Sequence, residues 1–195
     1  MRQLVVLVGV AGSGKTAFRL QHPDWAVVSR DVIRRTVFHR DYDPTFESAV
    51  EGIFASMLVE TVESGAEVVC VDNSNLKGEE RRRLIEVGKL AGRETIAYVM
   101  RLLSVEELYD RKTRQLAGLA EAFPDLVVRG FDRERFAELY RSYEPPLEAE
   151  GFDQIIADVV PVVPRRKVQR DRGKHVRARS AIEVANLDPL PLFAP

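Results

Sequence analysis

Two residues that could act on a phosphate group, Lys15 and Thr16, close a glycine-rich segment at residues 9–16. The segment reads GVAGSGKT and fits the pattern G-x-x-x-x-G-K-[ST] without a mismatch. In this pattern, glycines let backbone N–H groups turn towards phosphate oxygens, the lysine reaches the β- and γ-phosphates, and the hydroxyl ligates Mg²⁺. The sequence therefore predicts a loop that binds a nucleoside triphosphate with Mg²⁺. The residues predicted to contact the nucleotide are Gly12, Ser13, Gly14, Lys15 and Thr16.

The neighbours of this segment favour a phosphate loop over a glycine-rich turn with a chance lysine. The apolar run at residues 4–8 is short and rich in β-branched residues, as in a buried parallel strand. No helix breaker follows the loop until Pro23, so a short helix begins near Lys15. Strand, loop and helix form the context in which the pattern binds phosphate, and the N-terminus of the helix adds a favourable dipole.

Two acids follow apolar runs and could serve a phosphoryl-transfer reaction. Asp72 ends the run at residues 67–71, where such folds place a second group beside Mg²⁺; a turn or N-cap aspartate is the alternative. Asp31 follows the run at residues 26–28 and could accept the proton of an attacking hydroxyl, while Arg34 grips an anionic group of the acceptor. A helix N-cap with a local ion pair explains Asp31 and Arg34 equally well, so both interpretations stay open.

Three basic residues, Arg111, Lys112 and Arg114, precede a segment at residues 117–130 that contains glycines and a proline. We expect this segment to be mobile and to act as a lid over a triphosphate. Cations in front of such a lid are candidates for stabilising the charge of the transition state. An exposed amphipathic helix face is the alternative for all three. The basic run at residues 81–83 is interpreted as a solvated helix face with local ion pairs.

Strand-like and helix-like segments alternate along the chain, which predicts an α/β fold with a doubly wound, five-stranded parallel sheet. Asp31 is the expected N-cap of the second helix, and Ser104 begins a capping box that starts a helix ending near Leu116. The predicted strands are 4–8, 26–28, 67–72, 95–100 and 152–160, and the predicted helices begin near 15, 31, 45, 79, 105 and 132.

Composition restricts the class of protein. The chain of 195 residues is 45% hydrophobic and 30% charged, which suits one sizeable α/β domain. No apolar run approaches the ~20 residues of a bilayer span, so we expect no membrane partner and a cytoplasmic location. The single cysteine, Cys70, lies in an apolar run and is expected to be a buried structural thiol.

Charge is distributed unevenly between the predicted domain and the tail. Residues 1–164 carry 21 Lys and Arg against 27 Asp and Glu, whereas residues 165–179 carry eight Lys and Arg and one acid. We therefore expect a domain at residues 1–160 and a basic, proline-containing tail at residues 161–195. The tail could follow a nucleic-acid backbone or be a solvated extension, and the residues do not decide between the two.

Together these motifs resemble the P-loop polynucleotide 5′-hydroxyl kinases, in their kinase-only form, and their AAA-type ATP-binding relatives. The resemblance covers roughly residues 3–160 and implies a P-loop kinase fold with a helical lid at about residues 111–130. It also implies ATP and Mg²⁺ as ligands. The second lid arginine of the family commonly stands one residue further on, where this chain has Gln115. The motifs that carry the resemblance are GVAGSGKT (9–16), SRDVIR (29–34), VVCVDNSNLKGEERR (68–82), ELYDRKTRQ (107–115) and FAELYRSYEPPLEAEGFD (136–153).

The resemblance implies an enzyme that transfers the γ-phosphoryl group of ATP to a hydroxyl, most of all the 5′-OH of a DNA or RNA end. A kinase for a nucleoside, sugar or antibiotic hydroxyl is the alternative, because the net negative charge of the domain does not favour a large nucleic-acid-binding surface. A non-catalytic ATP-binding regulator is a third interpretation. The oligomeric state stays open. The implied roles are Lys15, Asp31, Arg111 and Arg114 in catalysis, Thr16 and Asp72 at the metal, and Arg34 and Asn75 at the acceptor.

Overall fold

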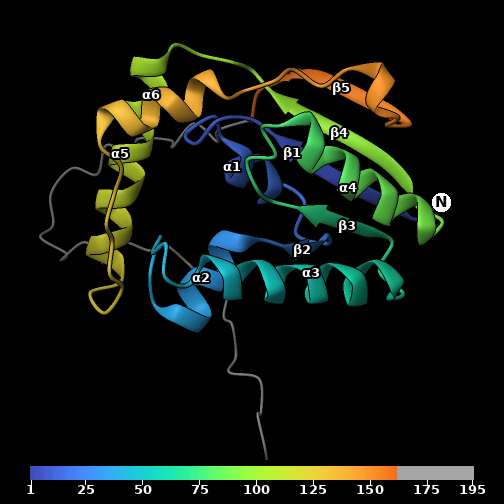
Figure 1. Ribbon diagram of the computed structural model, residues 1–195, viewed down its shortest axis with the longest axis horizontal. Helices are drawn as coiled ribbons and strands as arrows, with labels where there is room; N and C mark the ends of the chain where they lie inside the picture. The colour runs from blue at the N-terminus through green and yellow to red at the C-terminus, as the bar shows by residue number, and fades with distance from the viewer. Residues whose placement is uncertain (162–195) are drawn as a thin grey trace, which may run out of the picture. The chain divides into compact units, whose positions relative to one another are not determined.

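The fold is built on a five-stranded sheet with strand order β2-β3-β1-β4-β5, in which every paired strand is parallel (Figure 1). The computed structural model describes residues 1–161. The register pairs Val5 of β1 with Cys70 of β3 on one side and with Ile96 of β4 on the other. The predicted sheet is therefore confirmed. The strands are β1 Gln3–Val8, β2 Ala26–Val28, β3 Val68–Val71, β4 Glu94–Met100 and β5 Gln154–Val159.

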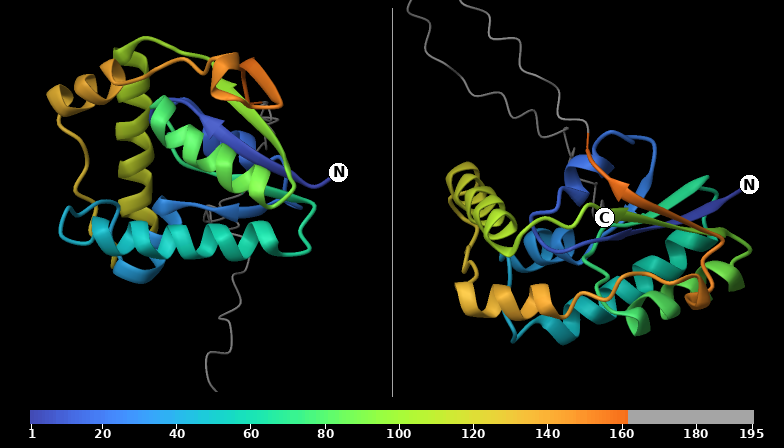
Figure 2. Two further views of the ribbon diagram at one scale, coloured as in Figure 1. Left: turned by 45° about the vertical axis from the view of Figure 1, so that its right-hand side comes forward. Right: turned by 90° about the horizontal axis from the view of Figure 1, so that it is seen from above.

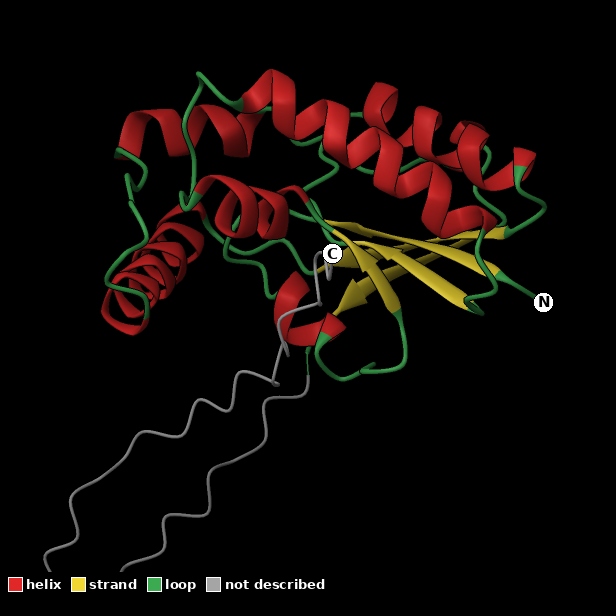
Figure 3. Ribbon diagram, turned by 90° about the horizontal axis from the view of Figure 1, so that it is seen from below, coloured by secondary structure: helices red, strands yellow, loops and turns green. Residues whose placement is uncertain are grey.

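Helices cover both faces of the sheet, because the central strand β1 is apolar on both of its sides. The long helices α3 (Glu47–Glu63) and α4 (Gly78–Leu90) lie on one face, and the short α1 (Lys15–Arg19) lies on the other (Figure 3). Leu4, Val6 and Val8 join the core under α3 and α4, whereas Val5 and Leu7 pack with Phe18 of α1. Because successive side chains of a strand point to opposite faces of the sheet, β1 contributes to two hydrophobic cores.

The remaining helices stand at the carboxyl ends of the strands, the edge from which the loop after β1 also leaves (Figure 2). A 3₁₀ turn, η1 (Glu148–Glu150), lies instead directly before β5 and against α4. The helices at the carboxyl ends are α2 (Arg30–Phe38), α5 (Val105–Ala122) and α6 (Arg133–Arg141). In parallel α/β sheets, ligands bind at this edge.

The predicted end of the helix that begins at Val105 is wrong, whereas the lid role of residues 111–130 stays a prediction. Helix α5 does not end near Leu116 but continues to Ala122, because nothing in residues 117–122 breaks its hydrogen bonds. The connection that follows pairs with the α2–α3 loop: Arg40 and Val127 form a parallel bridge, and the Asp41 carboxylate accepts hydrogen bonds from the Arg129 and Gly130 N–H groups.

One arginine of the run at residues 81–83, Arg81, is buried where a solvated helix face was expected. Arg81 is fully buried, donates two hydrogen bonds to Glu150 of η1 at 2.6 and 2.7 Å, and donates to two backbone carbonyls. The prediction of a solvated face is therefore wrong for Arg81. Arg83 is exposed and pairs with Glu79 as expected. Spacing along one helix could not reveal that η1, some 70 residues later, supplies a carboxylate.

Two other expectations can be compared with the described residues. Cys70 is fully buried, and burial raises the pKa of its thiol, which confirms a structural cysteine. None of the helices within residues 1–161 has the length and apolar character needed to cross a bilayer. The predicted basic tail lies outside the described residues, apart from Pro161.

Candidate functional site

The glycine loop between β1 and α1 adopts a conformation that only glycine accommodates easily. Gly12 and Gly14 have φ of +84° and +99°, in the left-handed region. A Cβ on Gly12 would overlap the Leu108 backbone oxygen, so α5 rests directly against the loop. The loop therefore needs glycine at position 12 both for its backbone angle and for its contact with α5.

Lys15 is buried at the first position of α1, with its side chain folded back over the loop. Its Nζ donates to the Gly9 and Val10 carbonyl oxygens at 2.7 and 3.1 Å. Burial lowers the pKa of Lys15 to about 8, against the opposing effects of the Asp72 and Asp31 carboxylates. The ammonium is held by two neutral acceptors where a phosphate would supply negative charge.

Thr16 and Asp72, the two predicted metal ligands, are adjacent. The Thr16 hydroxyl donates to Asp72 Oδ2 at 3.4 Å, and Arg19 Nε lies 3.6 Å from the same oxygen. Burial raises the pKa of Asp72, while Lys15 and Arg19 oppose that rise. A hydroxyl and a carboxylate beside the loop fit Mg²⁺, which usually takes one or two protein oxygens and completes its shell with phosphate and water oxygens.

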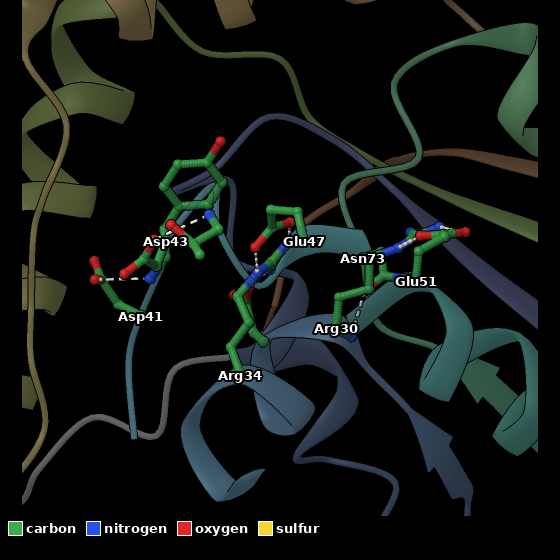
Figure 4. A network of polar contacts seen from close by, with 10 residues as sticks. Arg30, Arg34, Asp41, Asp43, Glu47, Glu51 and Asn73 are labelled. Carbon is green, nitrogen blue, oxygen red and sulfur yellow. Dashed lines mark hydrogen bonds and ion pairs between the residues drawn. The ribbon is translucent and has the colours of Figure 1, made fainter. Parts of the chain in front are cut away.

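Asp31 and Arg34 lie on one face of α2, as their spacing predicts. Arg34 donates to Asp31 Oδ1 at 2.7 Å. Its Nε and a terminal nitrogen donate to the two carboxylate oxygens of Glu47 at 2.8 and 2.6 Å (Figure 4). These bonds raise the pKa of Arg34 against the opposing effect of burial. Glu47, at the start of α3, was not predicted, because no motif or spacing in the sequence links it to Arg34.

The start of α2 differs from the prediction. The helix begins one residue earlier, at Arg30, with Ser29 as the N-cap residue, so Asp31 lies in the first turn instead of capping it. The Arg30 N–H donates to Asn73 Oδ1 at 2.9 Å, so a side chain from the loop after β3 satisfies this helix terminus (Figure 4). Asp31 is thereby free of the capping role and half exposed in its cavity.

Asn75 is tied to the sheet. It is buried, adopts φ of +46°, and donates from Nδ2 to the Leu7 carbonyl oxygen at 2.7 Å. This bond fastens the loop after β3 to the end of β1. The predicted contact of Asn75 with an acceptor stays a prediction.

A cavity of about 410 Å³ brings the predicted residues together. Of the basic residues on α5, Arg111 and Lys112 line it and Arg114 does not; Gln115 stands on the lining face in its place. Arg114 is exposed and donates to the Asp110 carbonyl oxygen within its own helix. Its predicted catalytic role stays a prediction without support from its position. The other predicted residues on the wall are Gly12, Gly14, Lys15, Thr16, Asp31, Arg34, Asp72 and Asn75.

A second cavity of about 520 Å³ adjoins the first one. Its wall mixes aromatic, basic and acidic side chains from α2, α6 and the loops at Tyr42 and Phe131. Arg135 of α6 lies over the Tyr42 ring, 4.5 Å from its centroid. Six residues line both cavities: Ala11, Asp31, Arg34, Ser74, Glu80 and Lys112.

The site thus combines a glycine loop before a helix with a buried lysine, a hydroxyl and an acid at the end of the neighbouring strand. Comparison with protein families matches residues 4–146 to the family described as AAA domain. The chain belongs to this AAA domain family. Comparison with curated proteins finds no match.

Solved structures share the fold. A kinase candidate from Chloroflexus aurantiacus j-10-fl is 19% identical with a TM-score of 0.56, over 80% of this chain and 87% of that one. A chain of the Pnkp1/Rnl/Hen1 RNA repair complex is 20% identical with a TM-score of 0.55, over 72% and 43%. A chain of the PezAT chromosomal toxin–antitoxin system of Streptococcus pneumoniae is 16% identical with a TM-score of 0.52, over 74% and 66%. The matched region is thus under two thirds of the length of the latter two. At these identities the likeness establishes the P-loop kinase fold.

Proposed function

We propose that this protein is a phosphotransferase that moves the γ-phosphoryl group of ATP to a hydroxyl. The observation that carries the proposal is the position of Asp31, whose side chain lines both the cavity of the glycine loop and the cavity next to it. A carboxylate between a donor site and an acceptor site is placed to receive the proton of an attacking hydroxyl. The family and the fold agree with such a reaction.

On the donor side, Lys15 exchanges the Gly9 and Val10 carbonyl oxygens for β- and γ-phosphate oxygens. The exchange replaces two neutral acceptors with charged ones and stabilises the ammonium. Thr16 and Asp72 would hold Mg²⁺, which neutralises phosphate charge when it is bound.

On the acceptor side, the hydroxyl oxygen attacks the γ-phosphorus and its proton passes to an Asp31 carboxylate oxygen. The bond from the γ-phosphorus to the bridging oxygen breaks, and ADP leaves with the electron pair. Arg34 holds one Asp31 oxygen at 2.7 Å and is itself fixed by Glu47, so the carboxylate keeps its direction. This orientation is a role for Arg34 beside the predicted contact with an acceptor phosphate.

For the acceptor, we propose the 5′-OH end of a polynucleotide. Arg34, Arg35, Lys77 and Arg135 line the second cavity and could contact phosphates beside the reacting end. One of the proteins with this fold belongs to an RNA repair complex. A small-molecule hydroxyl is the second candidate, because four acids interrupt this basic wall and would repel a phosphate backbone. They are Asp31, Asp41, Glu80 and Glu138.

The test is a transfer assay with ATP labelled in the γ-phosphate and Mg²⁺, comparing 5′-OH oligonucleotides of DNA and RNA with a panel of nucleosides, sugars and aminoglycosides. We expect label on the oligonucleotide 5′ end. Asp31→Asn should lower turnover by 10²–10⁴-fold with ATP affinity nearly unchanged. Label only on a small compound would move the proposal to the second candidate. ATP binding without transfer to any acceptor would refute the transferase assignment and favour a regulator.

A further inference from the structure

Lys112 of α5 lies where the donor and acceptor cavities meet. It belongs to the small group of residues that line both cavities, and its only basic companion in that group is Arg34. Arg34 is already bound by Asp31 and Glu47 through three hydrogen bonds. Of the two basic residues, Lys112 is therefore the freer one to bind a phosphoryl group that moves between the cavities.

The way α5 packs explains how Lys112 reaches this place. The buried residues of this helix are Leu108, Lys112 and Leu116, which repeat every four residues along one side. Leu108 lies against Gly12 of the glycine loop. Lys112 follows one turn later, so its aliphatic stem is buried in an apolar row while its ammonium extends into the cavity.

The ammonium of Lys112 has no hydrogen bond or ion pair with any residue between 1 and 161. Burial lowers its pKa, and the charges that face it come from α2 and the loop that follows: Asp31 and Asp41 favour its charged form, while Arg34 and Arg35 disfavour it. Leaving a buried lysine unpaired costs free energy of folding. A binding site can retain such an unfavourable lysine when a bound ligand supplies the negative charge that pairs with it.

The neighbouring arginines of α5 are engaged elsewhere. Arg111 is exposed and binds Glu107 one turn earlier at 2.7 Å. Arg114 is exposed and directed to a carbonyl of its own helix. The family resemblance implies that these two arginines are the catalytic lid residues. Among the basic residues of α5, however, only Lys112 is buried, lines both cavities and has an unpaired ammonium.

We infer that Lys112 is a catalytic residue that binds the oxygens of the transferring phosphoryl group as it passes from ADP to the acceptor hydroxyl. The inference rests on the proposed function and adds a residue to it. Lys112 neither gains nor loses a proton in the step: the bond to the acceptor oxygen forms, the bond to the β–γ bridging oxygen breaks, and the proton goes to Asp31. The charge of Lys112 balances the charge that spreads over the phosphoryl oxygens in the transition state.

The test measures transition-state binding without requiring a known acceptor. Binding of Mg²⁺–ADP is compared with binding of Mg²⁺–ADP plus aluminium fluoride, which imitates the planar phosphoryl group. We expect aluminium fluoride to tighten ADP binding to the wild-type protein. In Lys112→Met this tightening should fall at least tenfold, while the affinity for ADP alone changes less than threefold. Lys112→Arg, which keeps the charge, should retain most of it.

Lys89→Met is the matched control, because it removes one exposed lysine of α4 that lines neither cavity. Thermal unfolding separates a structural role from a catalytic one. A structural lysine would leave Lys112→Met less stable, whereas an unpaired catalytic lysine should leave it as stable as the wild type or more so.

The outcomes distinguish failure of the inference from failure of the proposed function. A Lys112→Met variant with wild-type tightening by aluminium fluoride would overturn the assignment of Lys112 and leave the phosphotransferase proposal intact. A wild-type protein that shows no tightening and no transfer of phosphate would overturn both. Equal losses in Lys89→Met and Lys112→Met would show a general effect of charge and would also overturn the inference.

Discussion

Nucleotide binding should take up a proton, because burial makes the Lys15 amine a weaker base. Burial lowers the pKa of Lys15 to about 8, from its ordinary 10.5. Phosphate oxygens within contact of Nζ favour the charged form and raise that pKa again. In the range from about pH 7 to 9, the bound state therefore holds more protons than the free state, and affinity falls as pH rises.

The magnitude follows from the pKa of about 8. The neutral fraction of Lys15 in the free protein is roughly 0.1 at pH 7, 0.5 at pH 8 and 0.9 at pH 9, and the proton uptake per nucleotide has these same values. Affinity for Mg²⁺–ADP should fall about tenfold between pH 7 and pH 9, which is about 1.4 kcal/mol. The phosphates contribute little above pH 8, because their last pKa lies near 6.

Isothermal titration calorimetry measures the uptake directly, in buffers of equal pH and different ionisation enthalpy. Lys112 is a second lysine in the cavity whose pKa is lowered by burial, so Lys112→Met serves as the control that isolates Lys15. An affinity that does not change from pH 7 to pH 9, with no proton uptake at pH 8, would refute the reasoning.

Without added nucleotide, the stability of the protein should change with pH in the opposite direction to the nucleotide affinity. The unfolded chain keeps Lys15 protonated up to about 10.5, whereas the folded protein releases the proton at about 8. The unfolded state therefore binds more protons between these values, and the contribution of Lys15 to stability increases as pH rises through that window. Denaturant unfolding at pH 8 and pH 10 of the wild type and of Lys15→Met measures this contribution.

Two further predictions concern the parts that hold the site. Arg81→Met should lower the free energy of unfolding by about 3–5 kcal/mol, because it leaves the partner Glu150 without its cation; Arg83→Met, at an exposed pair, should cost less than about 1 kcal/mol. Equal losses in urea unfolding would contradict the burial argument. Gly12→Ala should abolish the thermal stabilisation by Mg²⁺–ADP, because its Cβ meets α5, whereas Gly118→Ala in an open helical position should stabilise the protein by about 0.5–1 kcal/mol with binding retained. An alanine at position 12 that binds ADP normally would disprove the steric reasoning.

Local patterns predicted the elements of the fold well, since each element depends on residues close together in the chain. The run at residues 4–8 predicted the central strand, and the glycine motif predicted the loop after it. The main error in an element was the end of α5, because Gly118 does not stop a helix that is anchored by the packing of Leu108 and Leu116. A single glycine costs about 1 kcal/mol in a helix, which packing outweighs.

The sequence by itself determined the donor half of the candidate site. Lys15 and Thr16 belong to the glycine motif itself, so the chain places them at the loop. Asp72 lies beside them because β3, the strand that precedes it, pairs directly with β1. Parallel neighbours place their carboxyl ends at one edge, so the pattern alone was sufficient.

Only the tertiary structure decided which residues surround the predicted acceptor side. Glu47 reaches Arg34 from another helix, and the packing of α5 turns Lys112 towards the cavity and Arg114 away from it. A residue's distance along the chain does not fix the rotation of the helix that carries it; that rotation is set by which apolar side chains are buried. A short motif therefore predicts the chemistry of the loop. The partners of Asp31, and which basic residue of α5 faces the cavity, depend on how the helices pack.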